Sequence, residues 1–151
     1  MTVLVAIDGS GHSEAAVGEI TRRALPGGSE VRIISVVDTV YYPLVFPGEG
    51  GDMAMFVEIE ATARQRARAA VDKAAATIRA TGENRAVAIT ADVLSGNAKR
   101  AILEEAEAFG ADLIVVGSHG HGHFERFRLG SVSHAVAIHA NCSATSLVSP
   151  A

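Results

Sequence analysis

The chain has 151 residues, of which 48% are hydrophobic and 20% charged, a composition typical of one soluble globular domain with a full core. Its net charge of −4 excludes a general attraction to nucleic acid or anionic membranes, so an anionic ligand needs a local site. The single cysteine, Cys142, excludes an internal disulfide, and no apolar run reaches the ~20 residues that span a bilayer. We expect one cytoplasmic domain over residues 1–151.

The first predicted strand is Thr2–Ile7, an apolar and largely β-branched run that fits a strand covered on both faces. The turn-forming residues 8–11 interrupt it. Ser13 is expected to cap the helix that follows and that continues to Ala24. Leucine, proline and two glycines at positions 25–28 end this helix.

A second strand is predicted over Val31–Val37. Asp38–Asp52 is rich in proline and glycine and predicts a long irregular loop, which is often functional in a compact domain. Met53–Ala80 has apolar residues at three- and four-residue steps and predicts a long amphipathic helix. Its arginines are interpreted as a solvated face rather than a nucleic-acid patch; they are Arg64, Arg66 and Arg68.

The rest of the chain continues the alternation of strands and helices. Strands are predicted over Ala86–Leu94, Ala111–Val116 and, more weakly, Ala144–Ser149, and helices over Ala98–Phe109 and Ser131–Ala140. Five strands separated by helices indicate a doubly wound α/β domain, in which a parallel sheet has helices on both faces.

A glycine pattern marks the candidate site. Gly117 and Gly120 are separated by two residues, and Gly130-Ser131 follows after nine more. Glycines let the backbone approach a phosphate closely, and the amides at a helix start attract anions. The Ser131 and Ser133 hydroxyls add donors. Because ligands of open parallel sheets bind beyond the carboxyl ends of the strands, this pattern and Asp8, which follows the first strand, predict a phosphate-containing ligand.

The same residues resemble the universal stress proteins that bind ATP. The likeness is carried by residues 117–136 (GSHGHGHFERFRLGSVSHAV), by the opening residues 3–16 (VLVAIDGSGHSEAA) and by residues 111–120 (ADLIVVGSHG). It covers essentially the whole chain. It implies a Rossmann-like five-stranded parallel sheet, similar to that of the adenine nucleotide alpha hydrolases, with strand order 3-2-1-4-5.

The resemblance also implies roles for individual residues. Those expected beside the adenine and ribose are Ala6, Ile7, Asp8, Val36, Val116 and Gly117. Those expected to hold the phosphates are Gly120, Gly130, Ser131, Val132 and Ser133. Mg²⁺ or Mn²⁺ is expected to be bound through the phosphates, with no metal ligand assigned to the protein itself. AMP or another adenine nucleotide is an alternative to ATP, and the resemblance implies a homodimer.

The function implied is that of an ATP-binding, nucleotide-dependent regulatory module of the stress response. A slow ATPase or self-phosphorylating enzyme is an alternative, although no Walker lysine or nucleophile elbow is present. A metal-responsive protein is a second alternative, because imidazole side chains alternate along one loop at His119, His121 and His123. The last strand is more polar than is usual in the family, which bears on how a dimer would form. Cys142 is interpreted as packed rather than reactive.

Overall fold

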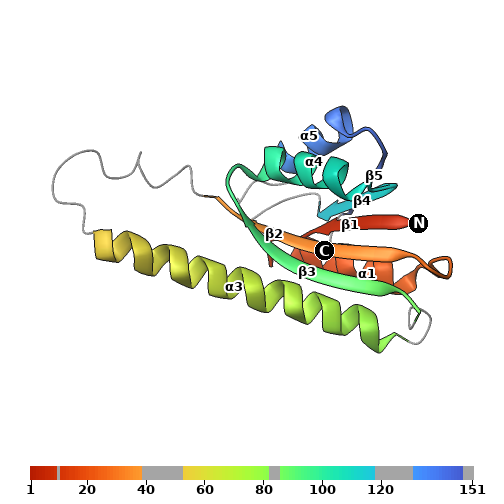
Figure 1. Cartoon of the computed structure of the whole chain (residues 1–151), viewed down its shortest axis with the longest axis horizontal. Coiled ribbons are helices and arrows are strands. Elements are labelled where there is room, and N and C mark those ends of the chain that lie inside the picture. Colours follow the sequence, from red (N-terminus) through yellow and green to blue (C-terminus); the bar gives the residue numbers. More distant parts are fainter. Residues whose placement is uncertain (10, 39–52, 82–85, 118–130, 148–151) are drawn as a thin grey trace.

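The structure is a computed structural model that describes residues 1–9, 11–38, 53–81, 86–117 and 131–147. Its elements alternate as expected from the sequence (Figure 1). In chain order they are β1 (Thr2–Ala6), α1 (Gly11–Arg22), β2 (Glu30–Val37), α3 (Met53–Ala80), β3 (Ala88–Ser95), α4 (Ala98–Phe109), β4 (Leu113–Gly117), α5 (Ser131–His139) and β5 (Ser143–Leu147). Thr39–Asp52 of the predicted loop lies outside the described residues.

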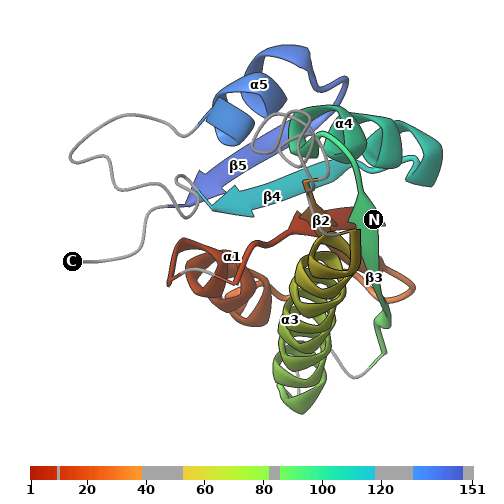
Figure 2. The same cartoon turned by 90° about the vertical axis from the view of Figure 1, so that its left-hand side faces the viewer.

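The five strands form one parallel sheet in the order β3-β2-β1-β4-β5, which confirms the predicted fold and strand order. Helices α1 and α3 cover one face of the sheet, and α4 and α5 cover the other (Figure 2). β1 lies at the centre, with β2 on one side and β4 on the other. Because both of its faces are covered, β1 is apolar at nearly every position.

Alternate residues of the central strands supply two separate cores. Val3, Val5 and Ile7 belong to the core beneath α1 and α3, together with buried side chains of both helices and of β2 and β4. Leu4 and Ala6 belong to the core beneath α4 and α5. The members of this second core on other elements are Ile34, Ile102, Ala106, Ile114, Val116 and Val136.

One charged cluster lies beside the α4/α5 core. Arg32 of β2 forms ion pairs with Glu105 of α4 and, at 3.6 Å, with Asp92 of β3. The Arg32 side chain is 24% exposed and that of Glu105 is 20% exposed. The partly buried guanidinium group therefore has two carboxylates near it, which joins α4 to the edge of the sheet.

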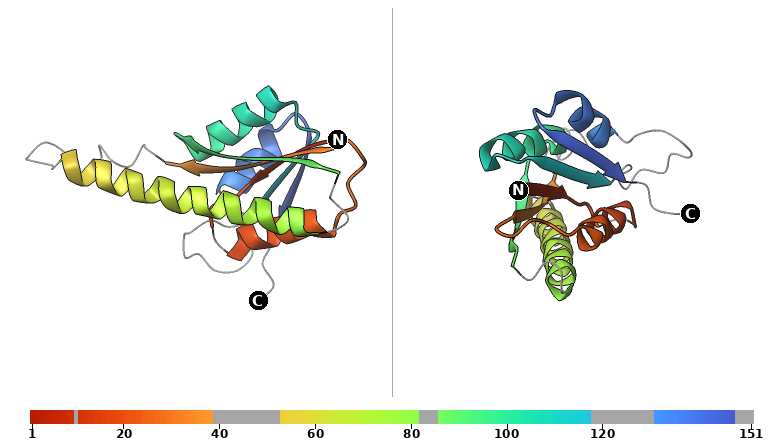
Figure 3. Two further views of the ribbon diagram at one scale, coloured as in Figure 1. Left: turned by 60° about the horizontal axis from the view of Figure 1, so that its bottom comes forward. Right: turned by 90° about the vertical axis from the view of Figure 1, so that its right-hand side faces the viewer.

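Helix α3 is buried over only part of its length. Its buried residues, Val71, Ala74, Ala75 and Ile78, all lie in the C-terminal half. The N-terminal part extends beyond the ends of the strands (Figure 3), and its exposed side chains include Met55, Val57 and Ile59. Arg64, Arg66 and Arg68 are also exposed to solvent.

Both ends of α4 have caps that the local sequence explains. The Asn97 side chain accepts a hydrogen bond from the Arg100 amide at 3.1 Å, which satisfies one of the amides left unpaired at a helix start. Gly110 follows the helix with φ +67°, a left-handed conformation that glycine adopts without a Cβ clash. The Ala111 amide then donates to the Ala106 carbonyl at 2.9 Å. These caps fix α4 to the limits that the sequence predicts.

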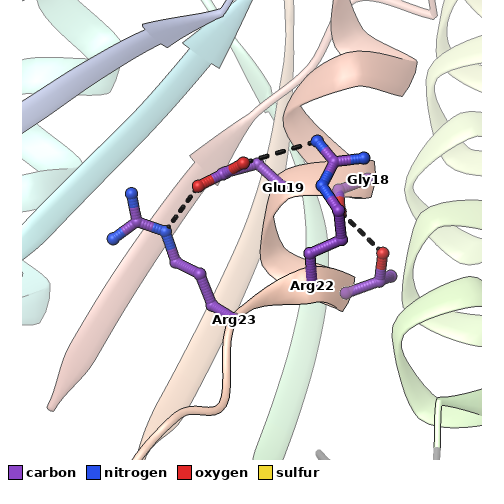
Figure 4. Close-up of polar contacts among 5 residues, drawn as sticks. Gly18, Glu19, Arg22 and Arg23 are labelled. Atoms are coloured by element: carbon purple, nitrogen blue, oxygen red, sulfur yellow. Dashed lines mark hydrogen bonds and ion pairs between the residues drawn. The ribbon is translucent and has the colours of Figure 1, made fainter.

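Helix α1 differs from its prediction at both ends. It begins at Gly11, so Ser13 lies in the first turn of the helix and is not its cap, which corrects the prediction. It ends at Arg22 rather than Ala24. Near that end Glu19 accepts from Arg23 at 2.9 Å and pairs with Arg22 at 3.4 Å (Figure 4). The hydrogen bond from Arg23 is the main cause that lowers the pKa of Glu19.

Side chains of the same chain form hydrogen bonds with backbone groups on the outer side of the edge strand β3. The Ala88 amide donates to the carbonyl of Ser29, just before β2, and the Gly96 amide donates to the carbonyl of Val37 in β2. The backbone N–H and C=O groups of the even-numbered residues of β3 therefore face β2, and those of the odd-numbered residues face away from the sheet. Of these, the Ile89 carbonyl accepts from Arg79 of α3 at 3.0 Å. The Val93 amide donates to the side chain of Asp92 at 2.8 Å. Two outward-facing backbone groups of this edge are therefore already paired.

Within the described ranges, none of the helices combines the length and the apolar character that crossing a bilayer requires.

Candidate functional site

The carboxyl ends of β2, β1 and β4 meet at one edge of the sheet. Ala6, the last residue of β1, is aligned with Ile34 of β2 on one side and with Val116 of β4 on the other. The Ile7 amide continues the ladder by donating to the Ile34 carbonyl at 2.9 Å. Strand order changes direction between β1 and β4, because β2 follows β1 on one side while β4 adds on the other. The structure thus has the switch point at which open α/β sheets bind ligands.

Asp8 lies at this switch point, two residues after the end of β1, and is exposed. Its amide donates to the Ser13 hydroxyl at 2.7 Å, and that hydroxyl donates to Oδ1 of Asp8 at 2.5 Å. Gly9, between them, has φ +82°, the left-handed conformation that turns the chain into α1. The carboxylate therefore reaches solvent beside the strand ends while its orientation is held by the first turn of α1.

The other predicted nucleoside contacts lie at the neighbouring strand ends. Ala6, Val36 and Val116 turn their side chains toward the core beneath α4 and α5, whereas Ile7 turns toward the opposite core. Because these side chains are used for packing, contacts from Ala6, Val36 and Val116 to a ligand would come from the main chain. Gly117 ends β4 next to them and is partly buried.

The start of α5 supplies the described part of the predicted phosphate site. The helix begins at Ser131, as predicted, and contacts α4, β4 and β5. Ser131 is exposed and Val132 is partly buried, while Ser133 is only 2% exposed. The backbone amides at a helix start and the positive end of the helix dipole favour an anion at this position. The roles of these three residues stay predictions.

Part of the predicted site lies outside the described residues. This applies to Gly120 and Gly130, and also to the histidines of the metal alternative, His119, His121 and His123. In the ranges that the structure describes, no group of three His, Cys, Asp or Glu side chains is arranged to hold a metal ion.

A cavity of about 300 Å³ lies between α1 and α3, beside the switch point. Ile7, Gly9 and Ser13 line one end of it, and small residues of both helices line the rest. Lys73 of α3 and Glu14 of α1 also line it and form an exposed ion pair at 3.5 Å. The cavity therefore reaches the first turn of α1 from the face opposite to Val36 and Val116.

A second cavity, of about 370 Å³, lies between α4 and α5 at the opposite, amino-terminal edge of the sheet. Cys142 lines it and is a partly buried free thiol. Burial raises the pKa of Cys142, and the negative charge of Asp112 raises it further. A raised pKa leaves less thiolate, the reactive form, at neutral pH. This agrees with the interpretation of Cys142 as packed rather than reactive.

Sequence reasoning identified Asp8 but missed the residue that orients it. Ser13 fitted the preference for serine at helix caps, and that preference gave the wrong role. The relevant signal is the glycine directly after Asp8, because a left-handed residue there bends the chain back so that the serine four positions later meets the carboxylate.

A scan against family models matches residues 1–145 to the Universal stress protein family. The chain is 29% identical over 140 residues to Universal stress protein A homolog 1 of Coxiella burnetii, covering 93% of this chain and 90% of that protein. Its fold is similar to that of the universal stress protein UspA from Lactobacillus plantarum, with a TM-score of 0.78, 22% identity and 97% of both chains covered.

The fold is also similar to that of a universal stress protein family protein from Arabidopsis thaliana with AMP bound. That comparison has a TM-score of 0.67 and 18% identity, and it covers 100% of this chain and 93% of the other. The family match spans nearly all of the sequence, and the strand order agrees with it. This chain therefore belongs to the universal stress protein family.

Proposed function

We propose that this protein binds ATP at the switch point between β1 and β4 and acts as a nucleotide-dependent regulatory module of the stress response. The observation that carries the proposal is the alignment of Ala6 with Val116, which brings Asp8 and Gly117 to the same edge of the sheet. Asp8 and the neighbouring main chain would hold the adenosine. The start of α5 would hold the phosphates.

Solved structures of similar fold support an adenine nucleotide as the ligand. Besides the Arabidopsis thaliana protein with AMP bound, they include a universal stress protein in complex with cAMP and one from Archaeoglobus fulgidus in complex with dAMP. All three ligands contain adenine, a sugar and one phosphate; dAMP differs from AMP in lacking the 2′-hydroxyl, and cAMP differs in its cyclic phosphate. The choice of ATP for this chain rests on its glycine and serine pattern, which is long enough for a polyphosphate.

We also propose that residues 1–151 form one domain, that Mg²⁺ or Mn²⁺ binds through the phosphates of the nucleotide, and that the protein is a cytoplasmic homodimer. The predicted contacts with the nucleotide are Ala6, Ile7, Asp8, Val36, Val116, Gly117, Gly120, Gly130, Ser131, Val132 and Ser133.

Thermal denaturation with and without ATP and Mg²⁺ tests the proposal. A ligand that binds only the native state stabilises it, and at one hundred times Kd the gain is about 2.7 kcal/mol. For a domain of this size that corresponds to a rise in Tm of roughly 5–10 °C. A Tm that millimolar ATP leaves unchanged contradicts the proposal.

A matched pair of variants locates the binding. Asp8→Asn removes the carboxylate at the switch point, and we expect it to weaken ATP binding about tenfold, the effect of losing one charged hydrogen bond. Asp72→Asn removes an exposed carboxylate on α3, which is 56% exposed and pairs with Arg68, and should leave the affinity unchanged. Isothermal titration calorimetry measures both. Equal affinities in the two variants place the ligand elsewhere.

A further inference from the structure

The side chain of Ser13 links Asp8 to helix α1. Its hydroxyl accepts from the Asp8 amide at 2.7 Å and donates to Oδ1 of Asp8 at 2.5 Å. Ser13 is 4% exposed, whereas Asp8 is exposed. A buried hydroxyl thus holds an exposed carboxylate. We infer that Ser13 is a positioning residue that sets the affinity of the site for the nucleoside end of its ligand, an inference that rests on the proposed function.

The two hydrogen bonds determine whether the Asp8 carboxylate donates or accepts. A backbone amide can only donate, so the Asp8 amide uses a lone pair of the Ser13 oxygen. The single proton of the hydroxyl is then directed at Oδ1 of Asp8, which accepts it. Asp8 is therefore an acceptor, which matches ligand groups that donate, namely the ribose hydroxyls and the adenine amino group.

Helix α1 gives this arrangement its rigidity. Ala16, Val17 and Ile20 bury the helix against the sheet, and Ser13 lies on the turn just before them. The left-handed Gly9 brings the chain around so that Asp8 faces this turn. A carboxylate that is already oriented loses less conformational freedom when a ligand binds. Removing the Ser13 hydroxyl should therefore weaken binding even though Ser13 itself need not touch the ligand.

Calorimetric titration of Ser13→Ala with ATP and with tripolyphosphate tests the inference. Tripolyphosphate has the phosphates but no nucleoside, so it does not use Asp8. We expect Ser13→Ala to bind ATP about tenfold more weakly and tripolyphosphate as tightly as the parent protein. Ser13→Thr keeps the hydroxyl and should restore most of the affinity for ATP.

Two controls separate positioning from a general loss of structure. Ser29→Ala removes a serine that is 1% exposed, whose hydroxyl donates to the Pro26 carbonyl at 2.6 Å at the amino-terminal edge of the sheet. It should leave both ligands unaffected. In a double-mutant cycle, Ser13→Ala should add little to the loss caused by Asp8→Ala, because both changes remove the same interaction. If Ser13→Ala does not fold, Ser13→Cys keeps the volume with a weaker donor and should lose ATP affinity in the same direction.

The possible results distinguish this inference from the proposed function. A parent protein that binds no ATP overturns both. Three results overturn the inference alone when the parent binds ATP: Ser13→Ala binds ATP as tightly as the parent, the losses of Ser13→Ala and Asp8→Ala add in full, or binding of tripolyphosphate falls by the same factor as binding of ATP.

Discussion

Asp112 ties the start of β4 to the start of β1. Its carboxylate accepts from the Thr2 amide at 2.8 Å, and the Thr2 hydroxyl lies 2.9 Å from the same oxygen. The Asp112 amide in turn donates to the Thr2 carbonyl at 2.8 Å. The hydrogen bond from the Thr2 amide, then that from its hydroxyl, lowers the pKa of Asp112, and the charge of the N-terminus lowers it further.

This lowered pKa predicts a specific dependence of stability on pH. Because the pKa of Asp112 is lower in the folded than in the unfolded chain, its contribution is present above the unfolded value of about 3.9. The contribution is lost as the pH falls through the folded value. Asp112→Asn should therefore lower the urea midpoint at pH 7, and the gap to the parent should narrow below about pH 4. A gap that stays constant from pH 7 to pH 2.5 contradicts this account.

At the residue scale, the sequence predicted where a residue lies in the fold better than it predicted which side chains that residue contacts. That Asp8 lies just beyond the first buried strand could be predicted, because a polar residue after an apolar run marks the strand end. The pairing of Asp8 with Ser13 could not, because it depends on the φ of Gly9 and on a helix start three residues earlier than a cap at Ser13 implies. The glycines and histidines of residues 118–130 remain predictions.

At the scale of elements, the caps of α4 give a test of local stabilisation. Asn97→Ala removes the side chain that accepts from the Arg100 amide, and we expect it to lower the free energy of unfolding by about 1 kcal/mol. Asn97→Gly should cost only a few tenths of that amount, because glycine is also accepted at a helix cap. Lys99→Ala, at an exposed position of the first turn, is the control and should be near neutral.

Urea unfolding measures these variants. If Asn97→Ala and Lys99→Ala have the same midpoint as the parent protein, the cap does not stabilise α4 measurably.

The accuracy of the predicted elements followed the strength of their local signals. The limits of Met53–Ala80 and Ala98–Phe109 are confirmed, since long apolar periodicity and a capping asparagine and glycine define them. The third strand begins two residues later than predicted, at Ala88, and the fourth at Leu113 rather than Ala111. Strand limits depend on which residues pair with a neighbouring strand, and a single sequence does not contain that information.

At the scale of the whole molecule, the sheet with a core on each face predicts that stability depends on both layers. Ile114 on β4 is fully buried beneath α4 and α5, so Ile114→Ala should lower the free energy of unfolding by about 2–5 kcal/mol. Ile138→Ala makes the same chemical change at a residue of α5 that is 60% exposed. It should change stability by less than about 0.5 kcal/mol. Comparable losses in the two variants contradict the described core.

The type of sheet and the order of its strands were predicted from different features of the sequence. Alternating strands and helices predicted a parallel sheet covered on both faces. They did not determine which strands are neighbours, and the order 3-2-1-4-5 followed from the family resemblance before the structure confirmed it. The position of the site followed from that order, because the carboxyl ends of β1 and β4 are adjacent only in such an arrangement.

The pairing along the outer side of β3 has a consequence for how copies of this protein meet. A strand arriving there would have to displace the Arg79 guanidinium from Ile89 and the Asp92 carboxylate from Val93 before it could add its own ladder. Edge strands whose outward backbone groups are already paired hinder the addition of a strand from another molecule. Although β3 is an edge strand, its outer side is therefore disfavoured as a place where a strand of another molecule could pair.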